Sequence, residues 1–236
     1  MIQAKCAPNS GLETYLRTHP KVALNGACDS PLEFTQGSWN RRVRVGEPTG
    51  LFGLTELMDN NPMVCADELS VPDAASTLAL IALGPLFRAG LLVEAPSLLY
   101  NFRDFDPEIV EAFLAGEGWA HGATFALAEE NLDSVLALRA ICLVQTASEL
   151  GDEIDEQYDE CYGRSFFVRN EENSEWHVNL VRGLPHAAYK LGISPGSPHS
   201  LLTVQVMADR DGKCGASQIV HAMNVMAGFE ECLGIA

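Results

Sequence analysis

The sequence predicts an α+β fold, in which a mostly antiparallel sheet is flanked by helices and preceded by a vestigial α/β segment. An almost completely apolar helical pattern ends at Gly90, strand-like stretches follow between residues 118 and 208, and a second apolar helical pattern covers residues 214–228. A strand-rich body with helices before and after it is typical of an α+β domain. We therefore expect one α+β unit whose sheet is flanked by the helices at 76–90 and 214–228.

The helices differ in how clearly their ends are marked. Ser10 and Glu13 have the spacing of a capping box, which predicts a short helix near the N-terminus. Asp106 is a suitable N-cap for a helix at residues 107–116, which has proline at its first position and ends at glycine. Residues 152–162 are acidic with one apolar face, which predicts a further helix.

The strand candidates share apolar alternation or β-branched residues over a short run. Proline and glycine interrupt every longer pattern between residues 29 and 73, so we expect a connector there. The strand candidates are residues 21–24, 43–45 and 63–65, stretches within 120–147 that include 135–144, and residues 165–169, 179–182, 186–191 and 201–208.

Composition excludes several classes of function. The chain has 236 residues, of which 47% are hydrophobic and 20% are charged, and this balance excludes disorder. Its net charge of −17 would repel nucleic acid and anionic lipid. No apolar run has the length of a membrane span or the position of a signal peptide, so we expect a soluble cytoplasmic protein. The seven cysteines form no CxxC motif and no HExxH motif is present, so we expect reduced thiols and no metal.

Several segments occur in the order and spacing of a known enzyme family. The last helix is expected within KCGASQIVHAMNVMAGFE at residues 213–230, and upstream of it are YGRSFFVR at 162–169, VRG at 181–183 and FGLTEL at 52–57. These segments resemble N-acetyl-gamma-glutamyl-phosphate reductases, whose C-terminal domain is of the aspartate-semialdehyde dehydrogenase type. The resemblance implies that residues 1–73 are a remnant of a nucleotide-binding domain with a connector, and that 74–236 are the reductase-like α+β domain.

The chain departs from this family at the positions that carry its chemistry. The family binds NADP at a glycine-rich loop, but here that loop is KCAPNSG at residues 5–11, in which only Gly11 remains. The positions of the family's catalytic cysteine and histidine are occupied by Ala75 and Phe105. We therefore expect no NADP cofactor and no reductase activity.

Seven residues are candidates for a retained or altered site. Lys213, Gln218 and Arg182 would bind an anion, since the family's substrate is an anion, and Ser76 and Thr77 would add hydroxyl groups. His186 is a candidate general base, and Cys214 is a candidate reactive thiol at a helix start. Six of the seven also have a structural alternative: ion pairs for Arg182 and Lys213, helix capping for Ser76 and Thr77, a simple hydrogen bond for His186, and packing for Cys214.

Three functions fit these observations. The first is an enzyme or binding protein for a small anionic metabolite of the amino-dicarboxylate type, in amino-acid biosynthesis. The second is a non-catalytic partner or regulatory subunit of a full-length reductase or another pathway enzyme. The third is a residual oxidoreductase. The apolar run at residues 135–144 also predicts a covered outer strand face, hence a homodimer or a hetero-partner.

Overall fold

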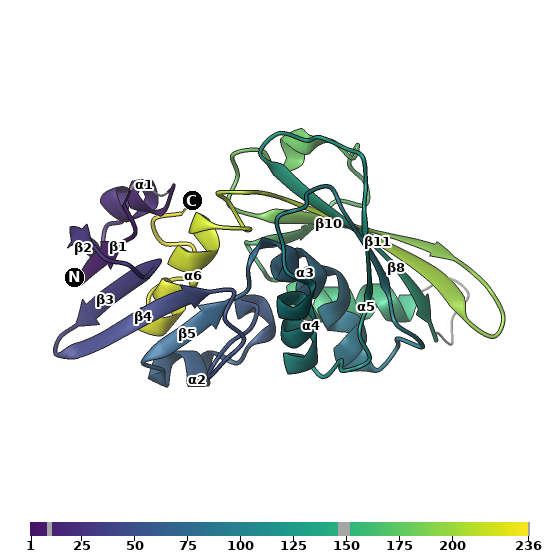
Figure 1. The fold of residues 1–236 in the computed structure, drawn as a ribbon, viewed down its shortest axis with the longest axis horizontal. Coiled ribbons are helices and arrows are strands. Elements are labelled where there is room, and N and C mark those ends of the chain that lie inside the picture. Colours follow the sequence, from purple (N-terminus) through teal and green to yellow (C-terminus); the bar gives the residue numbers. More distant parts are fainter. Residues whose placement is uncertain (9–10, 146–151, 236) are drawn as a thin grey trace.

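The computed structural model describes residues 1–8, 11–145 and 152–235 and contains two mixed sheets with six α-helices in these residues. Figure 1 shows the N-terminal sheet on the left and the larger sheet on the right. Ser10, the expected capping residue, lies outside the described residues. No helix in the described part of the chain combines the length and hydropathy that crossing a membrane requires.

The N-terminal sheet, sheet A, has the strand order β2-β1-β3-β4-β5. The first two strands are parallel and are joined by α1 (Gly11–Thr18), β3 is antiparallel to β1 and β4, and β4 and β5 are parallel. The strands are β1 (Ile2–Cys6), β2 (Val22–Ala27), β3 (Leu32–Gln36), β4 (Trp39–Val45) and β5 (Glu68–Val71).

The expectation of an irregular connector at residues 29–73 is wrong. Leu32 and Phe34 are buried on one face of β3, and Val43 is buried beside them on β4. This alternation is short and lies between turn residues, so the glycines and prolines concealed it. Residues 63–65 belong to a helix, α2 (Asn60–Cys65), rather than to a strand, and a 3₁₀ turn, η1 (Thr55–Leu57), precedes it.

The larger sheet, sheet B, has the order β7-β6-β8-β11-β10-β9. Its three central pairings are antiparallel and its two edge strands pair in parallel, so the mostly antiparallel sheet is confirmed. Residues 179–182 are not a strand; a 3₁₀ turn, η2 (Val178–Leu180), covers the first half of this stretch and a turn covers the second. The strands are β6 (Ser97–Tyr100), β7 (Thr124–Leu127), β8 (Val135–Val144), β9 (Val168–Asn170), β10 (Ala187–Ser194) and β11 (Ser200–Asp209).

Three helices pack around one face of sheet B: α3 (Ala74–Ala89), α4 (Pro107–Gly116) and α5 (Asp152–Tyr162). All three were expected from the sequence within a few residues. Helix α3 is buried along most of its length and ends at Gly90, whose φ of 64° favours glycine. Tyr162 of α5 donates a hydrogen bond to the Leu80 carbonyl at 3.2 Å, which fixes α5 against α3.

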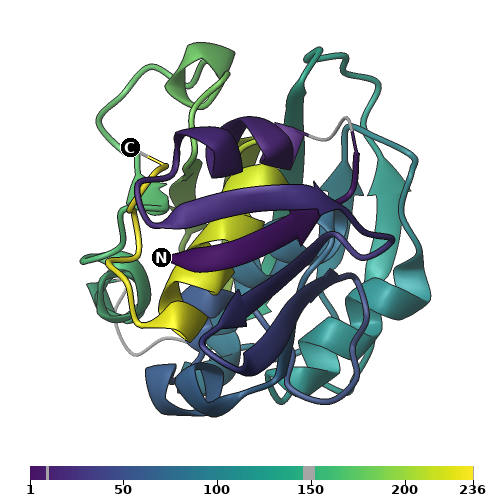
Figure 2. The same cartoon turned by 90° about the vertical axis from the view of Figure 1, so that its left-hand side faces the viewer.

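The last helix, α6 (Ala216–Ala227), does not flank sheet B as expected. It packs against α1, α2, β4 and β5, and its apolar residues share a core with sheet A. Figure 2 shows α6 behind the strands of sheet A. The buried Arg41 guanidinium of β4 donates to the carbonyls of Met63 at 2.9 Å and of Met226, which holds α6 on this sheet. The expectation of one unit is therefore wrong, because sheets A and B have separate hydrophobic cores.

Candidate functional site

The start of α3 is the position at which the resemblance would place a nucleophile. Asp73 caps this helix, because its carboxylate accepts a hydrogen bond from the Ser76 backbone N–H at 2.8 Å. The expectation that Ser76 or Thr77 caps the helix is therefore wrong. Both hydroxyl side chains are fully buried, and the Ser76 hydroxyl has no hydrogen-bond partner among the described residues.

Thr77 and Gln218 join α3 to α6. The Gln218 amide donates to the Pro72 carbonyl at 2.9 Å and to the Thr77 hydroxyl at 3.1 Å. Gln218 is 1% exposed, so these contacts lie in the interior between the two helices. Two of the expected binding residues therefore do meet, but they bind each other and the backbone.

Lys213 forms an ion pair with Glu56 of η1. The Lys213 Nζ lies 2.5 Å from Glu56 Oε1, and the two side chains are 0% and 4% exposed. The ammonium also lies 5.3 Å from the centre of the Phe167 ring. Burial acts to raise the pKa of Glu56, but the charge and the hydrogen bond of Lys213 oppose it, and the pKa stays below its usual value.

His221 of α6 continues this buried cluster toward the surface. Its Nε2–H donates to Glu231 Oε2 at 3.2 Å, and its ring stacks on Phe167 with the ring centres 4.0 Å apart. Its Nδ1 lies 3.6 Å from Glu56 Oε1, which is too long for a hydrogen bond. Burial lowers the pKa of His221, so the ring is neutral near pH 7.

Glu56 and His221 were not chosen from the sequence, although each lies in a segment that carries the family resemblance. Glu56 ends the FGLTE run, and His221 lies one turn after Gln218 on the same helix. Glu56 lies in a short apolar segment, and this position could have indicated a buried carboxylate. Carboxylates are rarely buried without a partner, so a paired cation would then be expected.

Cys214 has the environment of a packed thiol. It is 8% exposed, and its Sγ lies 3.9 Å from the Ala74 carbonyl oxygen. Burial raises the pKa of this thiol well above its ordinary value, and the charge of Lys213 only partly opposes the effect. Helix α6 begins at Ala216 with Gly215 as its N-cap, so Cys214 precedes the helix start. This environment favours packing over the reactive thiolate that we considered.

Arg182 and His186 lie apart from the residues around α3 and α6. Arg182 is exposed and pairs with Asp133 at 3.2 Å on the outer side of sheet B. His186 is buried, and its Nε2–H donates to the Leu180 carbonyl at 3.0 Å. Burial and the charge of Arg169 lower the pKa of His186. The seven candidates are therefore not gathered in one pocket.

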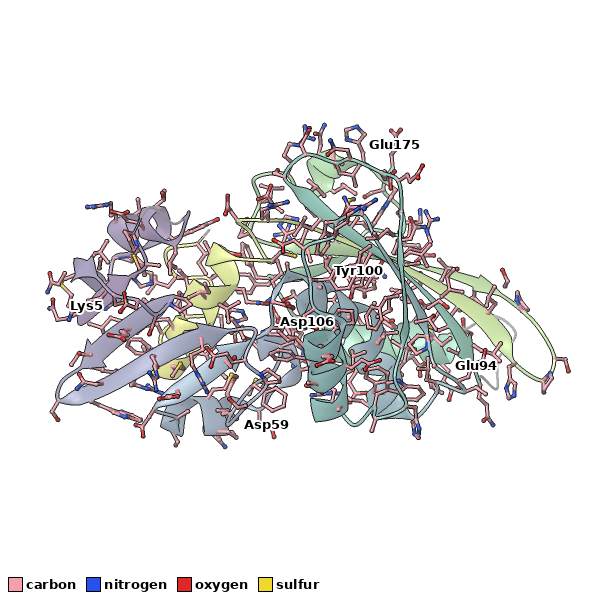
Figure 3. All side chains as sticks on the ribbon, in the orientation of Figure 1. Lys5, Asp59, Glu94, Tyr100, Asp106 and Glu175 are labelled. Carbon is pink, nitrogen blue, oxygen red and sulfur yellow. The ribbon has the colours of Figure 1, made fainter. Side chains whose placement is uncertain are left out.

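Ala75 and Phe105, where the resemblance would place the thiol and the base, are both in contact with Tyr100. The Tyr100 hydroxyl donates to the Ala75 carbonyl at 3.0 Å, and the rings of Tyr100 and Phe105 have centres 4.6 Å apart. Figure 3 shows Tyr100 in the interior of the right-hand part. Phe102 and Phe125 pack against Phe105, so this position is an aromatic cluster.

A cavity of about 240 Å³ lies beside the start of α1, where the resemblance would place a dinucleotide. Asp29 and Asp211 line it together with apolar residues of α6 and the loop before α1. Among the described residues, no group of three or more His, Cys, Asp or Glu side chains is arranged to hold a metal ion.

Comparison with solved structures identifies the fold. Aspartate semialdehyde dehydrogenase II from Vibrio cholerae matches with a TM-score of 0.59 over 96% of this chain and 99% of that one, at 10% identity. A structure of the Vibrio cholerae enzyme complexed with ASA matches with a TM-score of 0.52 over 75% of this chain and 68% of that one, also at 10% identity. The chain therefore has a semialdehyde dehydrogenase-like α+β fold.

Comparison of sequences confirms the more specific resemblance. The chain is similar to N-acetyl-gamma-glutamyl-phosphate reductase from Bacillus cereus, with 22% identity over 91% of this chain and 71% of the relative. No protein-family model matches the sequence. The chain is thus similar to these reductases over most of its length.

Proposed function

We propose that this protein is a catalytically inactive relative of N-acetyl-gamma-glutamyl-phosphate reductases that acts as a partner or regulatory subunit of a pathway enzyme. The observation that carries the proposal is the pair of Ala75 and Phe105, joined through Tyr100 at the positions that match the thiol and the base. A methyl group and a phenyl ring supply neither a nucleophile nor a proton acceptor. A residual oxidoreductase is therefore disfavoured.

The cavity beside α1 also supports a loss of NADP binding. Asp29 and Asp211 would repel the dinucleotide phosphates, and the volume of about 240 Å³ is below the usual range of about 300–1,000 Å³ for small-molecule sites. The Asp211 carboxylate also lies so close to Gly11 that a side chain added at this position would touch it. The residues present do not fit the cofactor.

The partner function is favoured over an amino-dicarboxylate site at the start of α3. Lys213 is neutralised by Glu56, and Arg182 pairs with Asp133 on the outer side of sheet B. An entering diacid would have to displace Glu56 from a buried ion pair, which is costly. Neither candidate cation, Lys213 or Arg182, is therefore available to bind a diacid at the start of α3.

The outer face of sheet B is the surface that we propose for the partner. Ile141 and Leu143 of β8 are only partly buried, and Leu201 of β11 is 44% exposed opposite Leu143. An apolar face of this kind on a central strand pair is stabilised when another chain covers it. Either a second copy or a full-length reductase of the cytoplasm would supply that cover.

The function is tested in two measurements on the untagged, purified chain. Fluorescence titration with NADPH is expected to show no binding at micromolar concentrations, and no turnover of N-acetyl-gamma-glutamyl phosphate is expected. Native mass spectrometry with an added full-length reductase is expected to show a mixed complex. Low-micromolar NADPH affinity would overturn the loss of cofactor binding. A chain that stays alone both by itself and with pathway enzymes would overturn the partner function.

A further inference from the structure

A second, larger cavity lies on the outer face of sheet B, away from the start of α3. Its volume is about 440 Å³, which is within the range of small-molecule sites. Strands β6, β8 and β11 form its floor, and the segments at 128–133 and 176–182 form its walls. Figure 3 labels Glu175, which projects at the top of the molecule beside the second of these walls.

The strand register places polar side chains across the floor of this cavity. Arg139 of β8 pairs with Leu99 of β6 on one side and with Gln205 of β11 on the other. Lys190 of β10 lies opposite Gln205, just outside the cavity lining. Neighbouring strands are about 4.8 Å apart, so Arg139 and Gln205 lie side by side on the floor, with Lys190 beyond Gln205.

None of these three side chains has an ion-pair or side-chain hydrogen-bond partner within the described residues. Arg139 is also exposed. Arg42, Arg44, Arg88 and Arg182, by contrast, each have a carboxylate partner. A free guanidinium beside a free amide matches the two oxygens of a carboxylate.

The other residues that line the cavity determine which chemical group can be attached to the carboxylate. Trp176 and Val178 supply apolar walls. Met207, which is 2% exposed, supplies an apolar part of the floor. Glu130 and Asp133 also line the cavity. Asp133 is paired with Arg182, which also lines the cavity, so the Glu130 carboxylate is the charge that would repel a second negative charge on the ligand.

We propose that this cavity binds a monocarboxylate with an apolar chain or ring of about the size of octanoate. The carboxylate contacts Arg139 and Gln205, and the apolar body packs against Trp176. The site goes beyond the proposed partner function, because it is a small-molecule cavity whose lining does not include Ile141, Leu143 or Leu201 of the partner surface. It also differs from the open apolar end of the same face at Leu143 and Leu201, four residues further along each strand.

The test is calorimetry of the whole chain with three eight-carbon probes. Octanoate is expected to bind, whereas suberate, which has a second carboxylate, and octanol, which has none, are expected to bind at least about tenfold more weakly. Arg139→Gln is expected to weaken octanoate by roughly ten- to a hundredfold, the usual effect of one charge-assisted contact. Arg139→Lys is expected to recover part of the affinity.

Arg164→Gln is the matched control, because it removes the same charge from an exposed arginine outside the cavity. It is expected to leave octanoate binding unchanged. A second readout is the Trp176 indole resonance, assigned with Trp176→Phe, which should shift on addition of octanoate. Three results would overturn the proposal. They are no heat on addition of octanoate, unchanged octanoate affinity in Arg139→Gln, and an equal loss of octanoate affinity in Arg139→Gln and in the control Arg164→Gln.

Discussion

Lys213 and Glu56 are 157 residues apart in the sequence, yet their charged atoms lie 2.5 Å apart in the interior. Glu56 comes from η1, before α3, and Lys213 comes from the link between β11 and α6. The pair therefore joins the chain on both sides of the boundary between the two hydrophobic cores. An ion pair of this kind is costly to break because either partner alone is a buried, uncompensated charge.

We predict that Lys213→Met lowers the free energy of unfolding by about 3–5 kcal/mol, because Glu56 is then left unpaired. The double variant Glu56→Gln with Lys213→Met is expected to recover a large part of this loss. Urea unfolding of the parent chain, both single variants and the double variant measures the coupling. Arg17→Met is the control, since it breaks an exposed pair with Glu13 and should cost less than about 1 kcal/mol. A loss below about 1 kcal/mol for Lys213→Met would contradict the prediction.

We predict that His221 makes the free energy of unfolding decrease as the pH falls below 6.5. Burial lowers its pKa in the folded chain from the usual 6.5, so below pH 6.5 the unfolded chain takes up a proton that the folded chain does not. The free energy of unfolding therefore falls as the pH decreases from 6.5, by up to about 1.4 kcal/mol per pH unit for this group. The pKa values of Glu56 and Glu231 are also lowered, and they add a further loss below pH 4.5.

The measurement is urea unfolding at several pH values between 5 and 7. His221→Gln is expected to reduce the slope over this range without abolishing it, because the buried His19 and His186 also have lowered pKa values. An unchanged slope in His221→Gln would show that the His221 ring does not carry the pH dependence.

Self-association is predicted through the open end of the outer face of sheet B. Light scattering at micromolar concentration should give twice the mass of the 25.5 kDa chain. Leu201→Asp places a charge on the exposed apolar surface and should restore the monomer without unfolding the chain, as judged by circular dichroism. Leu127→Asp, on an exposed leucine of the edge strand β7, is the matched control. A monomeric parent chain would instead favour a different protein as the partner.

Thiol reactivity should separate Cys65 from Cys214. Cys65 is exposed, whereas burial raises the pKa of Cys214 and removes its thiolate at neutral pH. An aromatic disulfide reagent is therefore expected to modify Cys65 rapidly and Cys214 only after unfolding. Cys65→Ser should remove the fast phase, and Cys214→Ser should leave it unchanged. Rapid loss of a thiol that depends on Cys214 would restore the reactive-thiol hypothesis.

The sequence by itself determined the elements whose signals are local. The carboxylate of Asp106 accepts from the Glu108 N–H only two residues away, and the left-handed residue that ends α3 is Gly90 itself. The strand at 135–144 was likewise predicted at its observed bounds, because one apolar run covers the same residues. Such signals require no knowledge of the rest of the chain, since the interacting groups are near neighbours.

Only the tertiary structure decided where α6 packs and what Lys213 does. Helix α6 is buried on all sides, so its pattern has no single apolar face that would indicate sheet A or sheet B. Lys213 follows Asp209 and Asp211 in the sequence, but folding brings it to Glu56 instead. Both outcomes depend on contacts between residues far apart in the chain, and burial, not sequence proximity, selects the partner of a charged group.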